Sequence, residues 1–126
     1  MKAIKITTAG EITAVDFPDS KNTGVILDAC RVHVDGWIEI VRPRFLYSIT
    51  MMPYTACMIV DEEGICKRKP INRVGTELYG AHSIVGDILI LNEVQGEDGG
   101  ELAGFEDSLA DIICHIMNNR FNEERR

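Results

Sequence analysis

Apolar residues recur along the chain at alternating and at helical spacings, which predicts strands interleaved with helices. Ile4 and Ile6 share one face of an alternating run, and Ala9–Gly10 supplies a turn, so a β-hairpin is predicted over 2–17. Runs rich in β-favouring and apolar residues predict further strands over 37–42, 57–61 and 85–91. The Asp61–Gly64 turn is predicted to lead into a short return strand at Ile65–Cys66.

Helical spacing predicts two long helices. Ile26, Leu27, Cys30 and Val34 predict a helix over 22–33, which Gly36 would end with a positive φ. Its first turn could be capped by Asp19, Ser20 or Asn22. The helix predicted over 105–121 has the clearest apolar stripe, formed by Leu109, Ile112, Ile113, Ile116 and Phe121.

Two shorter segments complete the prediction. Asn72 is a natural N-cap for a helix over 73–79, which stops at Gly80. The glycines and acids of 95–100 predict a flexible loop. Together these elements predict an α+β fold with one antiparallel or mixed sheet packed against two or three helices.

The 126 residues suit a single α+β domain over 1–126. No apolar run approaches the ~18 residues of a membrane span, and the first residues lack a signal-peptide core. We therefore expect a soluble, cytoplasmic protein that has no membrane partner.

Charge is unevenly distributed within the net value of −7. Residues 74–119 contain no Lys or Arg but nine Asp or Glu. Cations that neutralise phosphates supply much of the affinity for nucleic acid, so this acidic half disfavours a nucleic-acid partner. It fits an alternative function, that of an acidic protein-binding inhibitor or nucleic-acid mimic.

Residues for metal or nucleophilic chemistry are poorly spaced. The chain has no zinc-type spacing, no C-x-x-C pair among its four cysteines and no G-x-S-x-G motif. We expect reduced thiols, no metal and no cofactor. Glu39 and Asp61 are the candidate acid–base residues of a third hypothesis, a small enzyme, but a non-enzymatic role is favoured.

An anion site is the leading prediction, because basic residues precede the helix that begins after Asn72. Arginine donates paired hydrogen bonds to phosphate, and an aromatic ring can stack on a base. Since alternate strand residues point to opposite faces, Arg42 projects to the face opposite Trp37 and Glu39. Arg42 and Arg73 would lie on different faces, so the loop after Pro43 or a second subunit would have to bring them together. The predicted ligand-binding residues are Arg42, Arg44, Arg73, Trp37, Tyr54, Asn72 and Tyr79.

The segment after Pro43 is too apolar for a solvated linker. It forms either part of the core or a partner surface. We expect a homo-oligomer, most simply a dimer, that buries the side chains of Phe45, Leu46, Tyr47, Met51, Met52 and Tyr54.

Several sequence blocks between Val34 and Asp87 resemble a domain-of-unknown-function family. The blocks are Gly36–Val41, Val60–Gly64, Pro70–Arg73 with Thr76–Tyr79, and Ile84–Asp87. Gly75 departs from the alanine that the family pattern has before this threonine. The resemblance implies a small accessory protein, typical of phages, plasmids and other mobile elements, and implies no established enzymatic activity.

The leading hypothesis is therefore a non-enzymatic phage or mobile-element protein that sequesters an anionic small molecule. A nucleotide that serves as an immune signal of the host is one such ligand, which would make the role counter-defence. Binding should then depend on arginines, mimicry on acids, and catalysis should yield a changed ligand.

Overall fold

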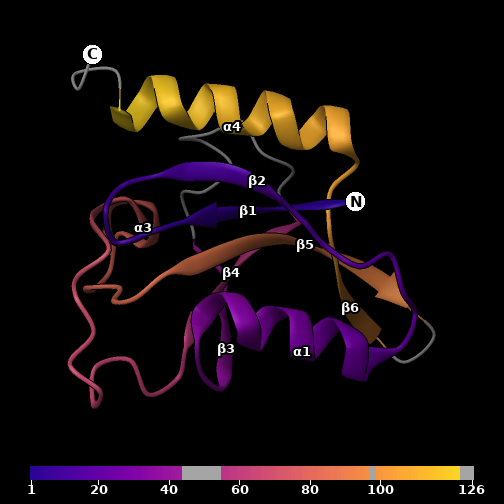
Figure 1. Cartoon of the computed structure of the whole chain (residues 1–126), viewed down its shortest axis with the longest axis horizontal. Coiled ribbons are helices and arrows are strands. Elements are labelled where there is room, and N and C mark those ends of the chain that lie inside the picture. Colours follow the sequence, from indigo (N-terminus) through magenta and orange to yellow (C-terminus); the bar gives the residue numbers. More distant parts are fainter. Residues whose placement is uncertain (44–54, 97–98, 123–126) are drawn as a thin grey trace.

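The computed structural model describes residues 1–43, 55–96 and 99–122 (Figure 1). It confirms the predicted α+β class. In chain order the elements are β1 (Lys2–Ile6), β2 (Ile12–Asp16), α1 (Thr23–Val34), β3 (Ile38–Val41), β4 (Ala56–Asp61), α3 (Arg73–Tyr79), β5 (Ile88–Gly96), β6 (Gly99–Ala103) and α4 (Asp107–Asn122).

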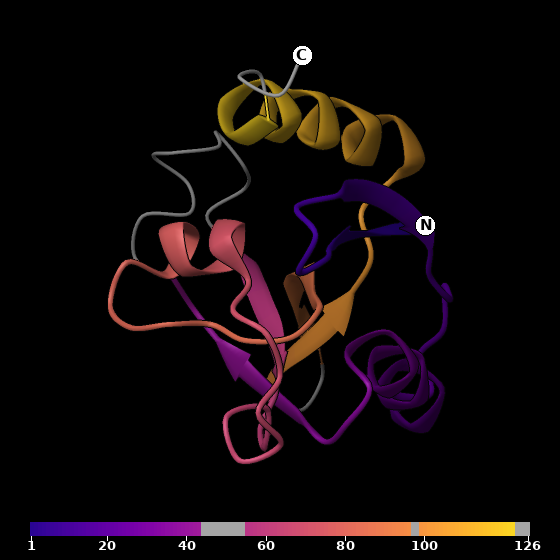
Figure 2. The same ribbon diagram turned by 60° about the vertical axis from the view of Figure 1, so that its left-hand side comes forward.

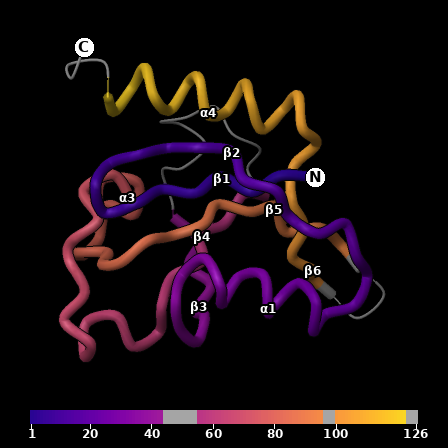
Figure 3. Tube along the Cα trace, viewed as in Figure 1, coloured from indigo at the N-terminus to yellow at the C-terminus, as the bar shows by residue number. Residues whose placement is uncertain are grey.

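All strands join one antiparallel sheet in the order β2-β1-β5-β4-β3, and β6 pairs with the second half of β5. β5 therefore lies between β1 and β4, although β1 comes from the opposite end of the chain (Figure 3). In this register Ile4 and Met58 both lie opposite Ile90. Their side chains share one face, since neighbours across a ladder point the same way.

The sheet separates two apolar layers. On one face α3 and α4 bury Val74, Leu78, Ile113 and Met117 against the strands. On the other face α1 buries Ile26, Cys30 and Val34 against a second set of strand residues. Figure 2 shows α3 and α4 across the strands from α1. Because successive strand residues point to opposite faces, the apolar runs of β4 and β5 supply side chains to both layers.

The ends of α1 differ in part from the prediction. Asn22 is the N-cap, and its side chain accepts hydrogen bonds from Gly24 N and Val25 N. The predicted stop at Gly36 is wrong, because Asp35 takes the left-handed conformation, with φ 55°, and its N–H donates to Arg31 O. A Cβ on Gly36 would lie 2.5 Å from Asp61 Oδ1, so close packing there calls for glycine.

Three other predictions need correction. The return strand at Ile65–Cys66 is absent, because residues 62–68 form successive turns. The predicted loop over 95–100 instead contains the end of β5 and the start of β6, which pair with each other. The strand predicted over 85–91 starts later, at Ile88, because Val85 makes an isolated bridge with Ile71.

The apolar stripe of α4 is only partly buried. Ala110, Ile113 and Met117 face the sheet, whereas Leu109 is 37% and Ile112 57% exposed. The helix begins at Asp107, two residues after the predicted start, because Phe105 pairs with Lys2 as an extension of the sheet. None of the helices in the described ranges is long and apolar enough to cross a membrane.

Candidate functional site

A hollow of about 190 Å³ opens on the face of the sheet that α3 covers. We call it the Glu39–Tyr79 pocket. β3 and the end of β4 form one side, and the end of α3 with the connection to β5 forms the other. The lining residues are Glu39, Val41, Val60, Asp61, Glu62, Ile65, Tyr79, His82, Ser83, Ile84 and Val85.

The pocket combines an aliphatic floor with a polar rim. Val60 and Ile84 are buried, and Val41 is half-buried against the same core. Glu39 and Glu62 are exposed on the rim. Neither carboxylate has a hydrogen-bond or ion-pair partner within the part of the chain that the structure describes. Charged groups of this kind are available to a ligand.

Two aromatic side chains complete the rim. The rings of Tyr79 and His82 meet edge to face, with their centroids 4.5 Å apart. The Nδ1 atom of His82 lies 3.2 Å from Ser83 O. Within the described residues the Tyr79 hydroxyl has no hydrogen-bond partner. The pocket therefore offers an aromatic wall beside its carboxylates.

Two side chains fix the wall that carries Tyr79. The fully buried Asn72 accepts from Gly75 N at 2.9 Å, and its Nδ2 donates to Ile6 O and Gly86 O at 3.0 Å. Thr76 Oγ1 accepts from Ile84 N at 2.9 Å, which ties the segment after α3 to the helix. The predicted cap at Asn72 is confirmed, but this side chain has no exposed surface for contact with a ligand.

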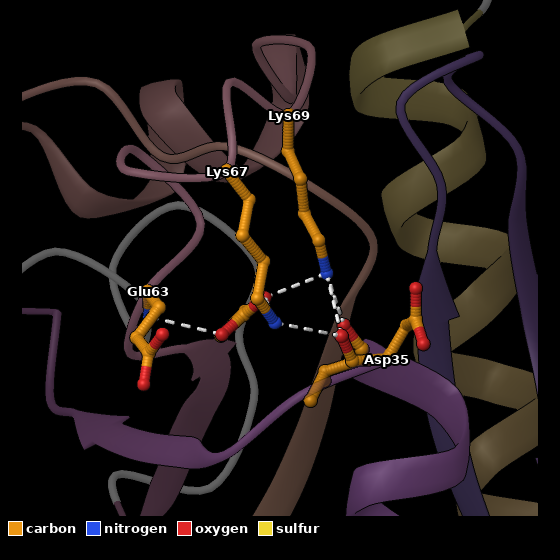
Figure 4. A network of polar contacts seen from close by, with 6 residues as sticks. Asp35, Glu63, Lys67 and Lys69 are labelled. Atoms are coloured by element: carbon orange, nitrogen blue, oxygen red, sulfur yellow. Dashed lines mark hydrogen bonds and ion pairs between the residues drawn. The ribbon is translucent and has the colours of Figure 1, made fainter.

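Asp61 lines one end of the pocket and belongs to an ion-pair network with Lys67 and Lys69, which are labelled in Figure 4. Its side chain has no exposed surface, and Oδ2 lies 2.8 Å from Lys67 Nζ and 2.7 Å from Lys69 Nζ. Oδ1 accepts from Glu63 N at 2.9 Å. Lys69 Nζ also donates to Val34 O and Asp35 O at the end of α1. We call residues Lys67–Lys69, which precede α3, the basic loop. The ammonium groups of both its lysines are thus bound to the protein itself.

The network sets the charge state of Asp61. Burial by itself raises the pKa of this carboxyl, but the hydrogen bonds from Lys67, Lys69 and Glu63 N–H outweigh it, so the pKa is lowered. The pKa of Lys67 is raised, chiefly by its hydrogen bond to Asp61. An ionised, fully paired Asp61 is a poor acid–base group, because its lone pairs are already occupied.

The predicted arginines do not meet within the described residues. Arg42 follows β3 on the α1 side of the sheet and forms a two-pronged pair with Glu93, at 2.8 and 2.7 Å. Arg73 lies at the start of α3, on the other side, and donates to Phe121 O at 3.3 Å. Arg44 and Tyr54 lie outside the described residues, as does the apolar segment 44–54. One subunit therefore does not join Arg42 and Arg73 in a single site.

Trp37 has a different cationic neighbour. The guanidinium carbon of Arg31 lies 4.3 Å from the centroid of the indole, a cation–π contact, and Trp37 is 59% exposed. The two residues line an open depression of about 410 Å³ together with Asp35, Gly36, Glu63 and Lys67. We call it the Trp37 surface. It lies away from Tyr79, which lines the other hollow.

Sequence reasoning nominated Glu39 and Tyr79 separately but missed Glu62, His82 and Arg31. Glu62 and His82 sit in turns, where no periodic pattern marks a side chain as facing a hollow. One signal was present, since all four blocks with the family resemblance contribute residues to this pocket. No group of three or more His, Cys, Asp or Glu could hold a metal within 1–43, 55–96 and 99–122.

A third hollow, of about 200 Å³, lies between the start of α1 and β6. Ile26, Leu27, Ile40 and Leu102 give it mainly aliphatic walls. Its charged residues are one lysine and one glutamate, and it has no aromatic residue. The Glu39–Tyr79 pocket is the more distinctive candidate because polar and aromatic groups converge there.

Comparison with known proteins identifies a family but no characterised relative. No curated protein and no solved structure matches the chain. A model of the family DUF3846, described as a domain of unknown function, matches residues 1–113. The match extends well beyond both ends of the region of resemblance between Val34 and Asp87, and includes all the residues that line the Glu39–Tyr79 pocket. The chain therefore belongs to the DUF3846 family.

Proposed function

We propose that this protein is a non-enzymatic accessory protein that binds a small molecule in the Glu39–Tyr79 pocket. One observation carries the proposal: Glu39, Glu62 and Tyr79, whose polar groups have no partner among the described residues, line one hollow with an aliphatic floor. Small-molecule sites typically combine apolar walls with a few convergent polar groups. The modest volume of about 190 Å³ fits a small ligand.

Binding is favoured over catalysis by the state of the reactive groups. Asp61 is fully paired with Lys67 and Lys69. Burial raises the pKa of Cys30 to about 11 and that of Cys57 to about 12, so neither forms the thiolate that a nucleophile requires at neutral pH. Of the two acid–base candidates that line the pocket, Glu39 is the one without a partner among the described residues, and the test below includes turnover.

The test is recovery of a ligand from cells. Native mass spectrometry of the purified protein should show a mass above that of the bare chain, and denaturation should release the added compound. Ser83→Phe places a ring on the pocket rim and should abolish retention. Ser108→Phe, the same change at an exposed position of α4, is the matched control and should retain the compound.

Equal retention by both variants would contradict the proposal, as would a bare chain in every preparation. A compound that is converted during incubation would instead support the enzyme hypothesis. Glu39→Gln should then stop the conversion while leaving the fold intact.

The Trp37 surface supports a second candidate function, capture of a planar anion such as a nucleotide immune signal. The supporting observation is the exposed indole stacked against Arg31, with Lys67 beside it. A base could stack on the indole while a phosphate contacts the Arg31 guanidinium, since aromatic stacking and charged donors together hold nucleotides at single-strand sites. Counter-defence in a phage or mobile element is part of this candidate.

Calorimetry with cyclic and linear nucleotides tests the second candidate. Trp37→Ala and Arg31→Gln should each weaken binding at least about tenfold, since base stacking alone contributes about 1–3 kcal/mol. Arg42→Ala and Arg73→Ala serve as controls, because these side chains lie on other surfaces and are paired with Glu93 and Phe121 O. Binding that depends on the controls instead would reassign the site.

A homo-oligomeric assembly and a cytoplasmic location belong to the same proposal. The support for assembly is the sequence of 44–54, whose large apolar residues suit an interface between subunits. Sedimentation velocity at micromolar concentration should give at least the mass of a dimer. A monomer across the accessible concentration range would contradict this part.

A further inference from the structure

We infer that the ligand of the Glu39–Tyr79 pocket is a small organic cation, such as an alkyl ammonium. The inference rests on the proposed function, since it names the chemical class for that same site. It also differs in sign from the anion predicted from the sequence. The argument has three independent parts: the charge of the lining, the aromatic wall and the aliphatic floor.

The lining is negatively charged, and no cation among the described residues compensates its two exposed carboxylates. Glu39 and Glu62 contribute two carboxylates, and the lining includes no Lys or Arg. The nearby loop lysines, Lys67 and Lys69, have their ammonium groups on Asp61 and on the last carbonyls of α1. Asp61 is therefore neutralised, whereas the two glutamates lack a partner in the described residues. An anion here would meet like charges without a compensating donor.

The aromatic wall suits the same ligand class. Tyr79 is half-buried and held edge to face against His82, so its ring is fixed in orientation. Ring faces attract ammonium groups through their quadrupole, and ligand cations are recognised in this way. Because the Tyr79 hydroxyl is unpaired among the described residues, it can also accept a hydrogen bond from an N–H donor.

The aliphatic floor requires an apolar part in the ligand. Val41, Val60 and Ile84 offer no hydrogen-bonding side chain. A metal ion or bare ammonium would leave this floor in contact with water, whereas an alkyl chain would cover it. The complementary molecule has a charged head between the glutamates and a short hydrocarbon tail on the valines.

A series of probes with equal chain length separates charge from shape. We use butylammonium, 1-butanol and butyrate, and follow the backbone amide signals of the pocket residues by NMR. Butylammonium should bind at least about tenfold more tightly than butanol, because a hydrogen bond to a charged group contributes about that factor or more. Butyrate should cause no shift in these signals.

Variants of matched charge locate the effect. The double change Glu39→Gln and Glu62→Gln should weaken butylammonium binding about tenfold or more, because it removes the charged acceptors. It should leave butanol binding unchanged. The double change Glu11→Gln and Glu101→Gln alters the net charge equally, at exposed positions outside the pocket, and should have no effect. Thermal unfolding confirms that all variants are folded.

The outcomes distinguish this inference from the proposed function. Equal affinity for butanol and butylammonium, no shift by any probe, or an effect as large in the Glu11/Glu101 variant, would overturn the cation inference. Retention of a cellular compound that Ser83→Phe abolishes would still support the pocket. If neither selective butylammonium binding nor retention of a cellular compound is observed, the cation inference and the proposed function are both overturned.

Discussion

The Oδ2 atom of Asp61 lies 2.7 Å from Lys69 Nζ, and the carboxylate that it belongs to has no exposed surface. Lys69 also holds the end of α1 through Val34 O, so one contact joins β4, the basic loop and the helix. Because of this pair, the lysines of the basic loop stabilise the fold instead of forming an open anion site.

Removing the Asp61 charge should destabilise the protein strongly. Asp61→Asn keeps the shape but leaves two ammonium groups without a counter-charge. We expect a loss of about 3 kcal/mol in the free energy of unfolding, at the low end for a buried pair because Lys67 is partly exposed. Urea denaturation measures it. Asp28→Asn, which breaks a surface pair with Arg31, should cost less than about 1 kcal/mol.

The same group should make stability depend on acid pH. The pKa of Asp61 is lowered below its ordinary 3.8, so the folded protein binds the proton less readily than the unfolded chain. Its contribution is complete above about pH 5 and is lost as the pH falls toward the folded pKa. The free energy of unfolding, measured from about pH 6 to about pH 2 to span this window, should fall less steeply with decreasing pH in Asp61→Asn than in the wild type. Parallel curves would contradict this assignment.

Gly36 should tolerate no side chain. A Cβ there would lie 2.5 Å from Asp61 Oδ1 and 2.6 Å from its Cγ, closer than atoms approach without displacement. Gly36→Ala should cost about 1–3 kcal/mol, the usual range for overpacking. In an Asp61→Ala background the added cost should shrink, because the clashing group is gone. An additive double-mutant cycle would show that the two positions are independent.

Asn72 and Asn22 form a natural comparison, since each caps a helix but only Asn72 is buried. Asn22→Ala should cost about 1 kcal/mol, the usual value for an exposed cap. Asn72→Ala should cost about 3 kcal/mol, because it also leaves Ile6 O and Gly86 O without their donor.

Aspartate provides the sharper test of this comparison. Asn22→Asp keeps the acceptor that the α1 cap needs and should be nearly neutral, by about 0.5 kcal/mol or less. Asn72→Asp removes the two donor bonds and should remain destabilising. Equal effects at the two positions, measured by chemical denaturation, would contradict the role of the Nδ2 bonds.

The cysteines should differ sharply in reactivity. Cys66 is exposed, whereas burial raises the pKa of Cys57 to about 12 and that of Cys30 and Cys114 to about 11. Because the thiolate is the reacting species, iodoacetamide at pH 8 should modify Cys66 first. Peptide mapping over a time course measures this. Early labelling of Cys57 would indicate that the central strands open readily.

Local chemistry predicted most of the fold. The Asn22 cap, the Asn72 cap and the continuous apolar run of β4 each follow from a few neighbouring residues. The pairing of β5 with β6 was missed because Gly96 and Gly99 are typical of loops, and only their pairing with each other makes them strand residues. The end of α1 at Asp35 was missed because glycine is the more usual residue at a left-handed helix end. Gly36 is required for another reason, close packing against Asp61, which is distant in sequence.

The candidate site was less predictable, because it depends on faces and turns. The alternation in β3 already placed Arg42 on the face opposite Glu39, and Arg73 lies across the sheet from Arg42, a separation that the sequence already suggested. Glu62 and His82 reach the pocket through turns whose geometry depends on long-range contacts such as Thr76 to Ile84. A sequence shows which residues are charged, but tertiary pairing decides which charges stay available.

The central position of β5 also bears on how the protein is made. Ile4 of β1 pairs with Ile90 of β5, so the two partners are 86 residues apart in the chain (90 − 4). During synthesis β1 therefore emerges long before the strand that it pairs with. The β1–β2 hairpin can form early, but its apolar face stays uncovered until β5 and α4 emerge. Pairings between such distant segments slow folding and lengthen the exposure of apolar surface. Nascent chains that stall before Ile88 should therefore be captured by chaperones, and those released after Asn122 should not.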